Sequence, residues 1–435
     1  MRRKHLLFFN YLTLSCLTTL SAHHALGVND LPAANERQKE TRIPQAPGNH
    51  LASATGGQAT KPRLGLGKLA QRLQIFSVPV TAEIDPGKGE DNPSSFWDGK
   101  PLRPVVFAPQ IDGGAKVGWT DTVGTVHITP LDRHMRRCGA DMLLEGVVLR
   151  DLVAHTDGSA ILTLQEGGMY LTRIRNQETI FRKRLISNAS RDIHWGSLAW
   201  NGDNYGTYFA VHGGGHEGDS LRFVNSDGEI VEGGWNWGVS HSIDMRLVSS
   251  GDAFFPVALS DAYPGTGIYF NHRAKRISYT WGDFSGGTGG RLGGLVATDD
   301  RIFLAFASKE GGRKHWSVAL GDFAKEHPHA QRVHKYLEDT DCDQLNVKMA
   351  RYGKKQLLIS WVEAVPGDRK FCLYNFQGER AGPAEVLSVT ASPRGDFQTL
   401  PDGSVAWADC GEAGSQMLKI MRITPSRLQL ATFNE

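Results

Sequence analysis

Three histidines stand at the two ends of one short stretch, residues 192–218, which reads DIHWGSLAWNGDNYGTYFAVHGGGHEG. His194 precedes the first of two β-like runs, and His212 and His216 follow the second. Imidazoles grouped in this way can act as general acids and bases near neutral pH, or they can hold a metal ion. The two chemistries need different neighbours and different supporting elements.

A zinc site is one interpretation of this group. Three imidazoles, from His194, from His212 or His216, and from His241, are enough to bind zinc. However, the three glycines of HGGGH favour a flexible loop, and the glutamate of a helical HExxH motif is missing. The sequence has no DxDxDG loop, so a calcium site is not predicted. We therefore expect that no cofactor is required, with zinc as the alternative.

The elements that position these residues repeat about every fifty residues. Each unit has an apolar anchor in a strand-like run, then a turn such as TDG, NGD, SGD or PDG, then a second run. Successive anchors are 45, 46, 49, 48, 54 and 48 residues apart. Four strands per repeat are typical of a propeller blade. We predict an all-β fold, a seven-bladed β-propeller with four antiparallel strands per blade; six or eight blades, or a β-sandwich array, are alternatives. The anchors are Phe107, Leu152, Leu198, Leu247, Leu295, Met349 and Phe397.

The propeller topology decides which residues share a face. The start of a blade's innermost strand and the end of its second strand lie on the same face, because the two strands are antiparallel neighbours. His194 is at such a start, and His212 and His216 are at such an end, so we expect all three on one face of blade three. Other polar residues expected on this face are Asp121, His241, Asp244, Arg246, Asp261, Tyr263, Arg291, Asp396 and Asp409.

These residue types suit proton abstraction beside a carboxylate. β-Elimination in a uronic-acid polysaccharide needs a cation or donor that neutralises the carboxylate, a base for the C5 proton, and an acid for the leaving oxygen. We predict that His194, His216 and Tyr263 exchange the protons. The predicted substrate-binding residues are Trp195, His241, Asp244, Arg246 and Arg291.

Two other reaction classes have less support. No GxSxG elbow indicates a nucleophilic serine. Asp244 and Asp261 belong to one blade and could form the carboxylate pair of a glycoside hydrolase. The simpler role for these two carboxylates is hydrogen bonding to strand ends.

The order of three motifs, DIHWG, HGGGHEG and SDAYPG, resembles that in secreted seven-bladed propeller polysaccharide lyases of the ulvan-lyase type. That family places two histidines on one blade and a tyrosine on the next. The resemblance spans about residues 100–435 and implies a lyase in which His194, His216 and Tyr263 are catalytic. The arginine that would neutralise the carboxylate stays open. The candidates are Arg246, Arg273, Arg276 and Arg291.

A glycan-binding propeller without catalysis is the alternative function, and a protein-interaction scaffold is another. Tryptophans such as Trp195, Trp235 and Trp281 could stack on sugar rings, although tryptophan in a blade commonly packs between blades. A lectin should repeat its pocket in several blades. The histidines of blade three are not repeated in blades two, five, six or seven, which favours an enzyme with one special site.

The N-terminus predicts export. MRRKH is followed by a mostly apolar stretch of 15 residues and by SAHHA, the pattern of a signal peptide in residues 1–25, which is too short to span a membrane. Residues 26–70 are polar and rich in Pro, Gly and Ala, so we expect a disordered leader before a propeller in residues 71–435. We expect a secreted or periplasmic monomer without a membrane span.

Charge and cysteine content narrow the partners and the covalent links. The formal net charge of +2 argues against a nucleic-acid partner and leaves an anionic polysaccharide or another glycan as the expected one. Outside the signal peptide, the even number of cysteines permits two disulfides, and Cys372 with Cys410 is a plausible pair because both lie in the last two blades. Buried free thiols are the alternative.

Overall fold

The structure is a computed structural model that describes residues 68–85, 105–187, 196–213, 216–238, 242–260, 267–270, 280–281, 292–309, 313–326, 333–338, 340–392, 395–411 and 414–426. The chain divides into two compact units, residues 1–63 and 64–435, and every described residue belongs to the second. The expected signal peptide and nearly all of the expected leader therefore lie outside the described residues.

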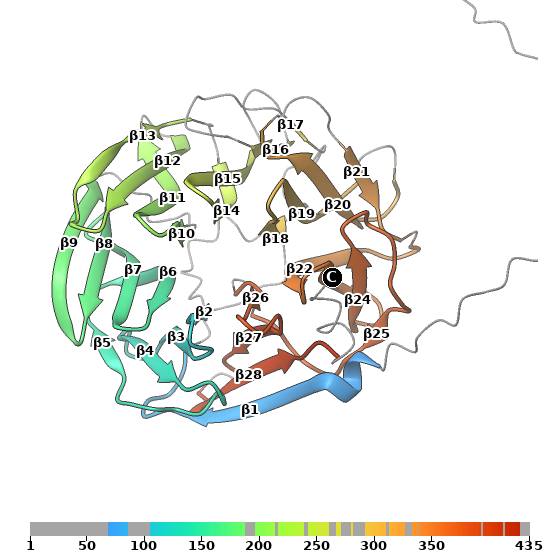
Figure 1. The fold of residues 1–435 in the computed structure, drawn as a ribbon, viewed down its shortest axis with the longest axis horizontal. Helices are drawn as coiled ribbons and strands as arrows, with labels where there is room; N and C mark the ends of the chain where they lie inside the picture. The colour runs from blue at the N-terminus through green and yellow to red at the C-terminus, as the bar shows by residue number, and fades with distance from the viewer. Residues whose placement is uncertain are drawn as a thin grey trace, which may run out of the picture. The chain divides into compact units, whose positions relative to one another are not determined.

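The second unit consists of seven four-stranded antiparallel sheets arranged in a ring, which confirms the predicted seven-bladed β-propeller (Figure 1). Apart from η1 (Leu69–Arg72), a single 3-10 turn, the described elements are strands. The strands of blades one to three are β2 (Val106–Pro109), β3 (Ala115–Thr120), β4 (Val126–Leu131), β5 (Met142–Leu144), β6 (Val148–His155), β7 (Gly158–Gln165), β8 (Gly168–Arg175), β9 (Glu178–Ile186), β10 (Gly196–Trp200), β11 (Asn204–Gly213), β12 (His216–Asn225) and β13 (Ile230–Asn236). The strands of blades four to six are β14 (Ser242–Ser250), β15 (Ala253–Ser260), β16 (Gly267–Phe270), β17 (Thr280–Trp281), β18 (Leu292–Ala297), β19 (Arg301–Ser308), β20 (Ser317–Ala324), β21 (Val333–Tyr336), β22 (Gln344–Tyr352), β23 (Gln356–Glu363), β24 (Arg369–Asn375) and β25 (Glu385–Val386). Blade seven contains β26 (Gln398–Thr399), β27 (Val405–Asp409), β28 (Met417–Ile423) and β1 (Leu73–Pro79).

The seven predicted anchors mark the innermost strands. Six of them lie within the first strand of their blade, and Phe397 immediately precedes β26. Neighbouring blades cover both faces of the second strands, and β7 and β19 are buried along nearly their whole length. Period and turn chemistry therefore identified the blades correctly.

The ring closes through its N-terminal strand. β1 pairs along its whole length with β28, from Leu73 opposite Ile423 to Pro79 opposite Met417, and becomes the outer strand of blade seven (Figure 1). Just before it, Leu69 is buried, and its backbone NH donates to Glu385 at 2.7 Å. Blade seven is thus built from both ends of the described chain.

The core is a series of apolar layers between neighbouring blades. Three of the largest fully buried side chains, Trp119, Trp361 and Trp407, lie on second strands and pack against the adjacent blade. Trp235 is also buried, in the layer that begins at blade three, and donates to Asp219 at 3.3 Å. Trp235 is therefore a packing residue, whereas the side chains of Trp195 and Trp281 lie outside the described part.

The predicted disulfide between Cys372 and Cys410 is not formed. The four cysteines of the described chain are free. Cys372 faces the layer between blades five and six, whereas Cys410 faces the layer between blades seven and one. Adjacent blades therefore present these two thiols to different layers.

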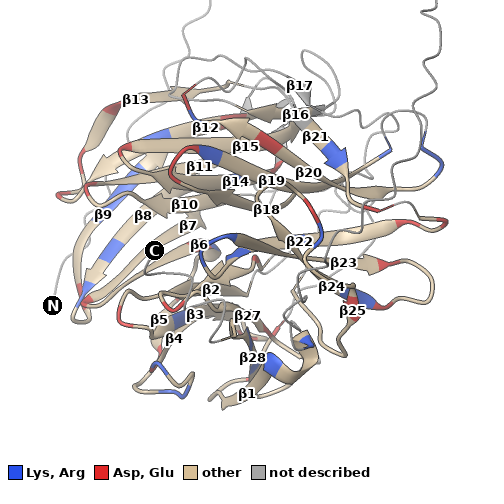
Figure 2. Cartoon of the chain, turned by 45° about the vertical axis from the view of Figure 1, so that its right-hand side comes forward, with Lys and Arg blue, Asp and Glu red and all other residues tan. Residues whose placement is uncertain are grey.

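The surface has no strong excess of one charge. Acidic and basic residues are both spread over the described blades, which agrees with a net charge close to zero (Figure 2). No helix in the described ranges is long and apolar enough for a membrane crossing.

Closure by β1 can be tested with two truncations. A chain that begins at residue 68 should melt at the same temperature as a chain that begins at residue 26. A chain that begins at residue 80 also loses the buried side chains of Leu69 and Val78, each worth about 1.5–3 kcal/mol, and should be at least about 3 kcal/mol less stable to urea. Equal stability of the two truncated chains would show that β1 does not close the ring.

Candidate functional site

The strand ends that flank the predicted motifs meet at one edge of blades three and four. In blade three, β10 starts at Gly196 opposite Phe209, and β11 continues four residues further to Gly213. In blade four, Ser242 at the start of β14 pairs with Ser260 at the end of β15. Innermost strands β10 and β14 are neighbours in the ring (Figure 1). The topological rule used to group the predicted residues is therefore confirmed for the strands that carry them.

Most of the predicted site side chains lie outside the described part of the structure. His194 and Trp195 immediately precede β10, and His241 immediately precedes β14. Tyr263 follows β15 and Arg291 precedes β18. His216 is the first residue of β12, where only its backbone is described.

The HGGGH segment joins two paired strands. β11 and β12 remain paired up to Gly213 opposite His216, with only residues 214 and 215 between the strands. His212 pairs with Glu217, so the two histidines occupy different steps of the ladder. His212 is therefore a matched control for His216.

A buried carboxylate fixes the end of blade three beside this hairpin. Asp219 is fully buried and accepts hydrogen bonds from the hydroxyl of Tyr208 at 2.7 Å and from the backbone NH of Gly238 at 2.5 Å. The backbone NH of Trp237 also donates to the Asp219 carbonyl at 2.6 Å. Asp219 thereby holds the chain after β13 against the first residues of β12. The edge that carries His216 has a rigid support.

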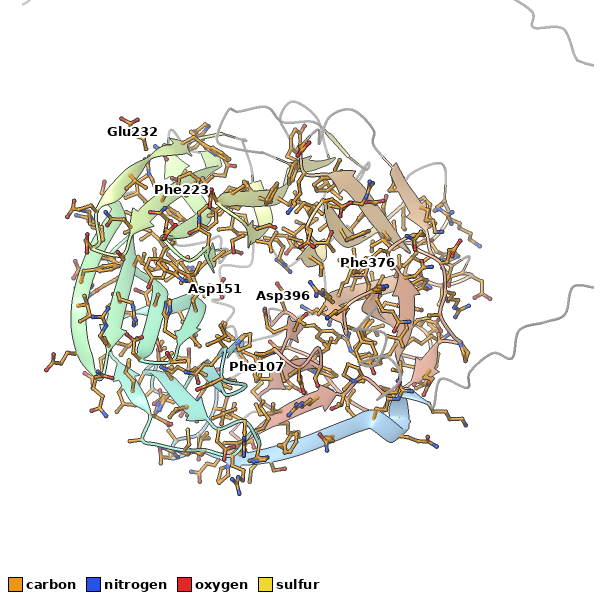
Figure 3. All side chains as sticks on the ribbon, viewed as in Figure 1. Phe107, Asp151, Phe223, Glu232, Phe376 and Asp396 are labelled. Carbon is orange, nitrogen blue, oxygen red and sulfur yellow. The ribbon has the colours of Figure 1, made fainter. Side chains whose placement is uncertain are left out.

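Charged side chains gather where the innermost strands face the central channel. The residue just before each anchor occupies equivalent positions around the ring, and Figure 3 shows Asp151 and Asp396 near its centre. Six of the seven residues line a cavity of about 470 Å³. The seven positions are Val106, Asp151, Ser197, Arg246, Gly294, Lys348 and Asp396.

Bulges in the innermost strands set these positions. The pairing register shifts between the first and second strands in four blades, at residues 149–151, 243–246, 292–295 and 345–348. Asp244 and Asn346 occupy equivalent sites in two of these bulges, both with φ of 48°. Asp and Asn tolerate this left-handed conformation better than most residues. The bulges re-aim the next side chains toward the channel.

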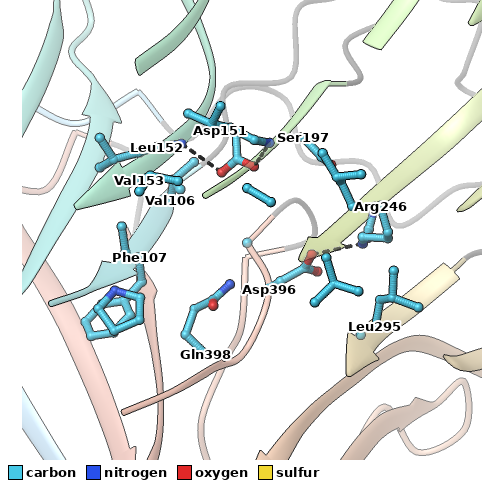
Figure 4. A pocket seen from close by; sticks show the side chains of 18 of the residues that line it. Val106, Phe107, Asp151, Leu152, Val153, Ser197, Arg246, Leu295, Asp396 and Gln398 are labelled. Carbon is cyan, nitrogen blue, oxygen red and sulfur yellow. Dashed lines mark hydrogen bonds and ion pairs between the residues drawn. The ribbon is translucent and has the colours of Figure 1, made fainter. Parts of the chain in front are cut away.

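Two predicted substrate-binding residues form an internal network in the channel. The Arg246 guanidinium forms ion pairs with Asp244 at 2.8 Å and with Asp396 at 2.9 Å. Figure 4 shows the pair with Asp396. Because Asp396 belongs to blade seven, the second ion pair crosses the channel. Burial alone would lower the pKa of Arg246, but Asp396 and Asp244 raise it above its ordinary value.

Asp244 has the structural role that the sequence suggested as the simpler one. One carboxylate oxygen accepts from Arg246, and the other accepts from the backbone NH of Leu292 at 2.6 Å. Asp244 is 1% exposed and ties blade four to the first residue of β18. Among the carboxylates at second-strand ends, Asp121 similarly bonds the backbone NH of Thr125 at 2.7 Å.

Sequence reasoning missed three ionisable residues of the channel. Asp151 accepts backbone hydrogen bonds from Leu152 at 2.8 Å and from Leu198 of blade three at 2.6 Å. Lys348 is buried 3.7 Å from Asp396. Arg150 stands beside Asp151 in the bulge of β6. Their sequence positions could have identified two of them, because Asp151 and Lys348 stand immediately before predicted anchors.

Burial changes the pKa values of two of these groups. It raises the pKa of Asp151 to about 7, although hydrogen bonds from Leu198 and Leu152 oppose the shift. It lowers the pKa of Lys348 to about 7, and Asp396 opposes that shift. A pKa near neutrality means that the charge of the channel depends on pH in the physiological range.

The Asp151 shift predicts a pH dependence of stability. The pKa of Asp151 in the folded chain is above its unfolded value, so its favourable contribution is present at low pH and is lost as pH rises through about 7. The melting temperature of the wild type, relative to that of Asp151→Asn, should therefore fall between about pH 5 and about pH 8. A difference that stays constant across this range would show that Asp151 does not titrate there.

The zinc interpretation concerns residues outside the described side chains. Within the described part, no group of three or more His, Cys, Asp or Glu side chains is arranged to hold a metal ion. His194, His212, His216 and His241 are not among the side chains described there.

Comparisons with known proteins support the fold alone. No protein-family model and no curated protein sequence matches the chain. The hydrazine synthase structure from Kuenenia stuttgartiensis matches with a TM-score of 0.50 and 10% identity, over 74% of this chain and 96% of that chain. A chain of the mitotic checkpoint complex matches with a TM-score of 0.48 and 10% identity, over 86% of this chain and 100% of that one.

A prolyl endopeptidase structure matches with a TM-score of 0.45 and 11% identity, over 70% of this chain. The present chain spans about half the length of that protein, since the match covers 45% of it. Propellers with different functions share this architecture, so function has to be argued from the site. What the comparisons support is that this chain is similar in fold to other β-propeller proteins.

Proposed function

We propose that this protein is an exported polysaccharide lyase that cleaves a uronic-acid-containing polysaccharide by β-elimination. One observation carries the proposal: the strand ends next to DIHWG, HGGGHEG and SDAYPG meet at one edge of neighbouring blades. Loops grouped at one end of a rigid scaffold are the usual location of function. Residue types suited to proton transfer stand next in the chain to these strand ends.

The proposed reaction requires two proton transfers. A base removes the C5 proton beside the uronate carboxylate, the electron pair of that C–H bond forms the C4–C5 double bond, and the C4–O bond breaks. An acid protonates the leaving oxygen. His194, His216 and Tyr263 supply the base and the acid, because imidazole and phenol can each act in both directions. Trp195 and His241 stand next in the chain to the same strand ends, Arg291 immediately precedes β18 in blade five, and all three would contact the sugar.

The described residues support this site in a specific way. Asp219 fixes the end of blade three, and Asp244 fixes the start of blade five. Catalytic groups must be held close to their productive geometry, and buried hydrogen-bonded supports provide that rigidity. Arg246 is paired with Asp244 and Asp396, so its charge is already balanced within the chain.

The test is incubation of the mature chain with a panel of uronate polysaccharides, with ultraviolet absorbance of the unsaturated uronate as the readout. We expect product from at least one uronate polymer and none from a neutral polymer. Binding without any unsaturated product would favour the glycan-binding alternative. A chelator should leave the activity unchanged; a loss that zinc restores would instead support the zinc site.

A further inference from the structure

Arg150 is a buried cation at the junction of blades two and three. It is the extra residue of the bulge in β6, between Leu149 and Asp151, and its side chain is 4% exposed. A Cβ placed on Gly196 would lie 3.0 Å from the Cβ of Arg150 and 3.3 Å from its Cγ. The Arg150 side chain therefore passes directly beneath the first residue of β10, which follows DIHW in the chain.

The guanidinium of Arg150 differs from the other buried channel cations in having no partner among the described residues. Its Nε, Nη1 and Nη2 atoms are buried and make no hydrogen bond there. The neighbouring carboxylate of Asp151 is occupied by the backbone NH groups of Leu152 and Leu198. By contrast, Arg246 has two carboxylate partners, and Lys348 lies near Asp396.

Burying a charge without a counter-charge costs free energy, so Arg150 destabilises the fold unless something pairs with it. Burial lowers the pKa of Arg150 to about 10, so the side chain still carries its charge at neutral pH. An apolar side chain of similar length would fill the same space without that cost. The arginine is explained if its partner is a ligand.

We propose that Arg150 binds an oxyanion group of a ligand, a carboxylate or a sulfate, where the cavity wall meets the start of β10. The planar guanidinium fork matches the oxygen pairs of both groups and binds them with two parallel hydrogen bonds. Arg150 and Gly196 both line the cavity of about 470 Å³, so an oxyanion that reaches the guanidinium would enter from this cavity.

The source of the oxyanion rests on the proposed function, whereas the site itself does not. An acidic polysaccharide carries carboxylates and often sulfate esters, and a free inorganic anion has the same chemistry. If the sugar is the source, Arg150 provides the carboxylate-binding charge at the edge next to His194. None of the arginines that the sequence offered for this role was Arg150.

The experiment measures the melting temperature of the mature chain, and the Kd from its concentration dependence, with sodium glucuronate, sodium sulfate or glucose at constant ionic strength. A ligand that binds the folded state raises the melting temperature. We expect a rise with glucuronate or sulfate and none with glucose. A response to glucuronate alone assigns the site to a uronate, and a response to sulfate alone assigns it to a sulfate group or a free inorganic anion.

Arg150→Met should raise the melting temperature in the absence of anion, because it removes an unpaired buried charge. It should also weaken glucuronate or sulfate binding by about tenfold to a hundredfold, the loss expected for hydrogen bonds to a charged group. Arg150→Lys keeps the charge but not the fork and should bind with intermediate affinity. The matched control is Arg222→Met, which changes a partly buried arginine of β12 and should leave the anion response unchanged.

The proposal is overturned if wild type shows no response to either anion, or if Arg150→Met responds as wild type does. Both results are independent of lyase activity. Anion binding that needs Arg150, in a protein that forms no unsaturated product, would support this site and reject the lyase. Lyase activity together with an anion response unchanged in Arg150→Met would support the lyase and reject the Arg150 site.

Discussion

Replacing His194 by Ala is expected to lower the turnover of a uronate polysaccharide by about 10²–10⁴-fold, the usual contribution of a general acid or base. Tyr263→Phe should have an effect of the same order, because it removes only the hydroxyl that transfers the proton. Turnover should fall far more than KM rises, since these groups act mainly in the transition state. Initial rates of unsaturated-product formation over a range of substrate concentrations measure both quantities.

His212→Ala is the internal control for these variants. His212 pairs with Glu217 in the ladder, one step away from His216, so its removal should change turnover much less than His216→Ala. Thermal melting of each variant checks that the fold is retained. If His194→Ala and Tyr263→Phe keep full activity, the edge of blades three and four is not the catalytic site.

Replacing Arg246 by Met is expected to destabilise the fold by about 3–5 kcal/mol, the usual cost of removing one partner of a buried ion pair. The substitution leaves Asp244, which is 1% exposed, and Asp396 without their shared counter-charge. Urea unfolding of the wild type and the variant measures the loss. A double variant, Arg246→Met with Asp396→Asn, should be less destabilised than the two single losses combined, because one unpaired charge is also removed.

The matched control is Arg136→Met. Arg136 forms an ion pair with Asp132 at the same 2.8 Å distance, but its side chain is 72% exposed. Exposed ion pairs contribute about 0–1 kcal/mol, so this variant should be nearly as stable as the wild type. An Arg246→Met variant no less stable than Arg136→Met would show that the cross-channel ion pair does not tie the ring.

The blades could be predicted because their signal is local and repeated. Five of the seven anchors, such as Leu152, are buried, Leu247 and Leu295 are partly buried, and in each blade a turn follows the anchor at a similar distance. Pairing of the N-terminal strand with blade seven could also be anticipated, because an open ring leaves an unpaired strand edge.

The channel network was harder to predict. The sequence indicated that Asp244 and Arg246 lie at the start of an innermost strand, but not that Arg246 reaches Asp396 in a blade across the channel. Each of the four bulges also shifts the register by one residue, and one residue decides which side chain faces the channel. Arg150 was missed for this reason, since the bulge of β6 determines where its side chain lies.

The most direct test of the proposed function is the mass of the oligosaccharides that the mature chain releases from a uronate polysaccharide in heavy-oxygen water. β-Elimination predicts fragments that end in an unsaturated uronate, are lighter by one water than hydrolysis products, and contain no heavy oxygen. Fragments that carry heavy oxygen and the full hydrolysis mass would contradict the lyase mechanism, as would the absence of any fragment from every uronate polymer tested.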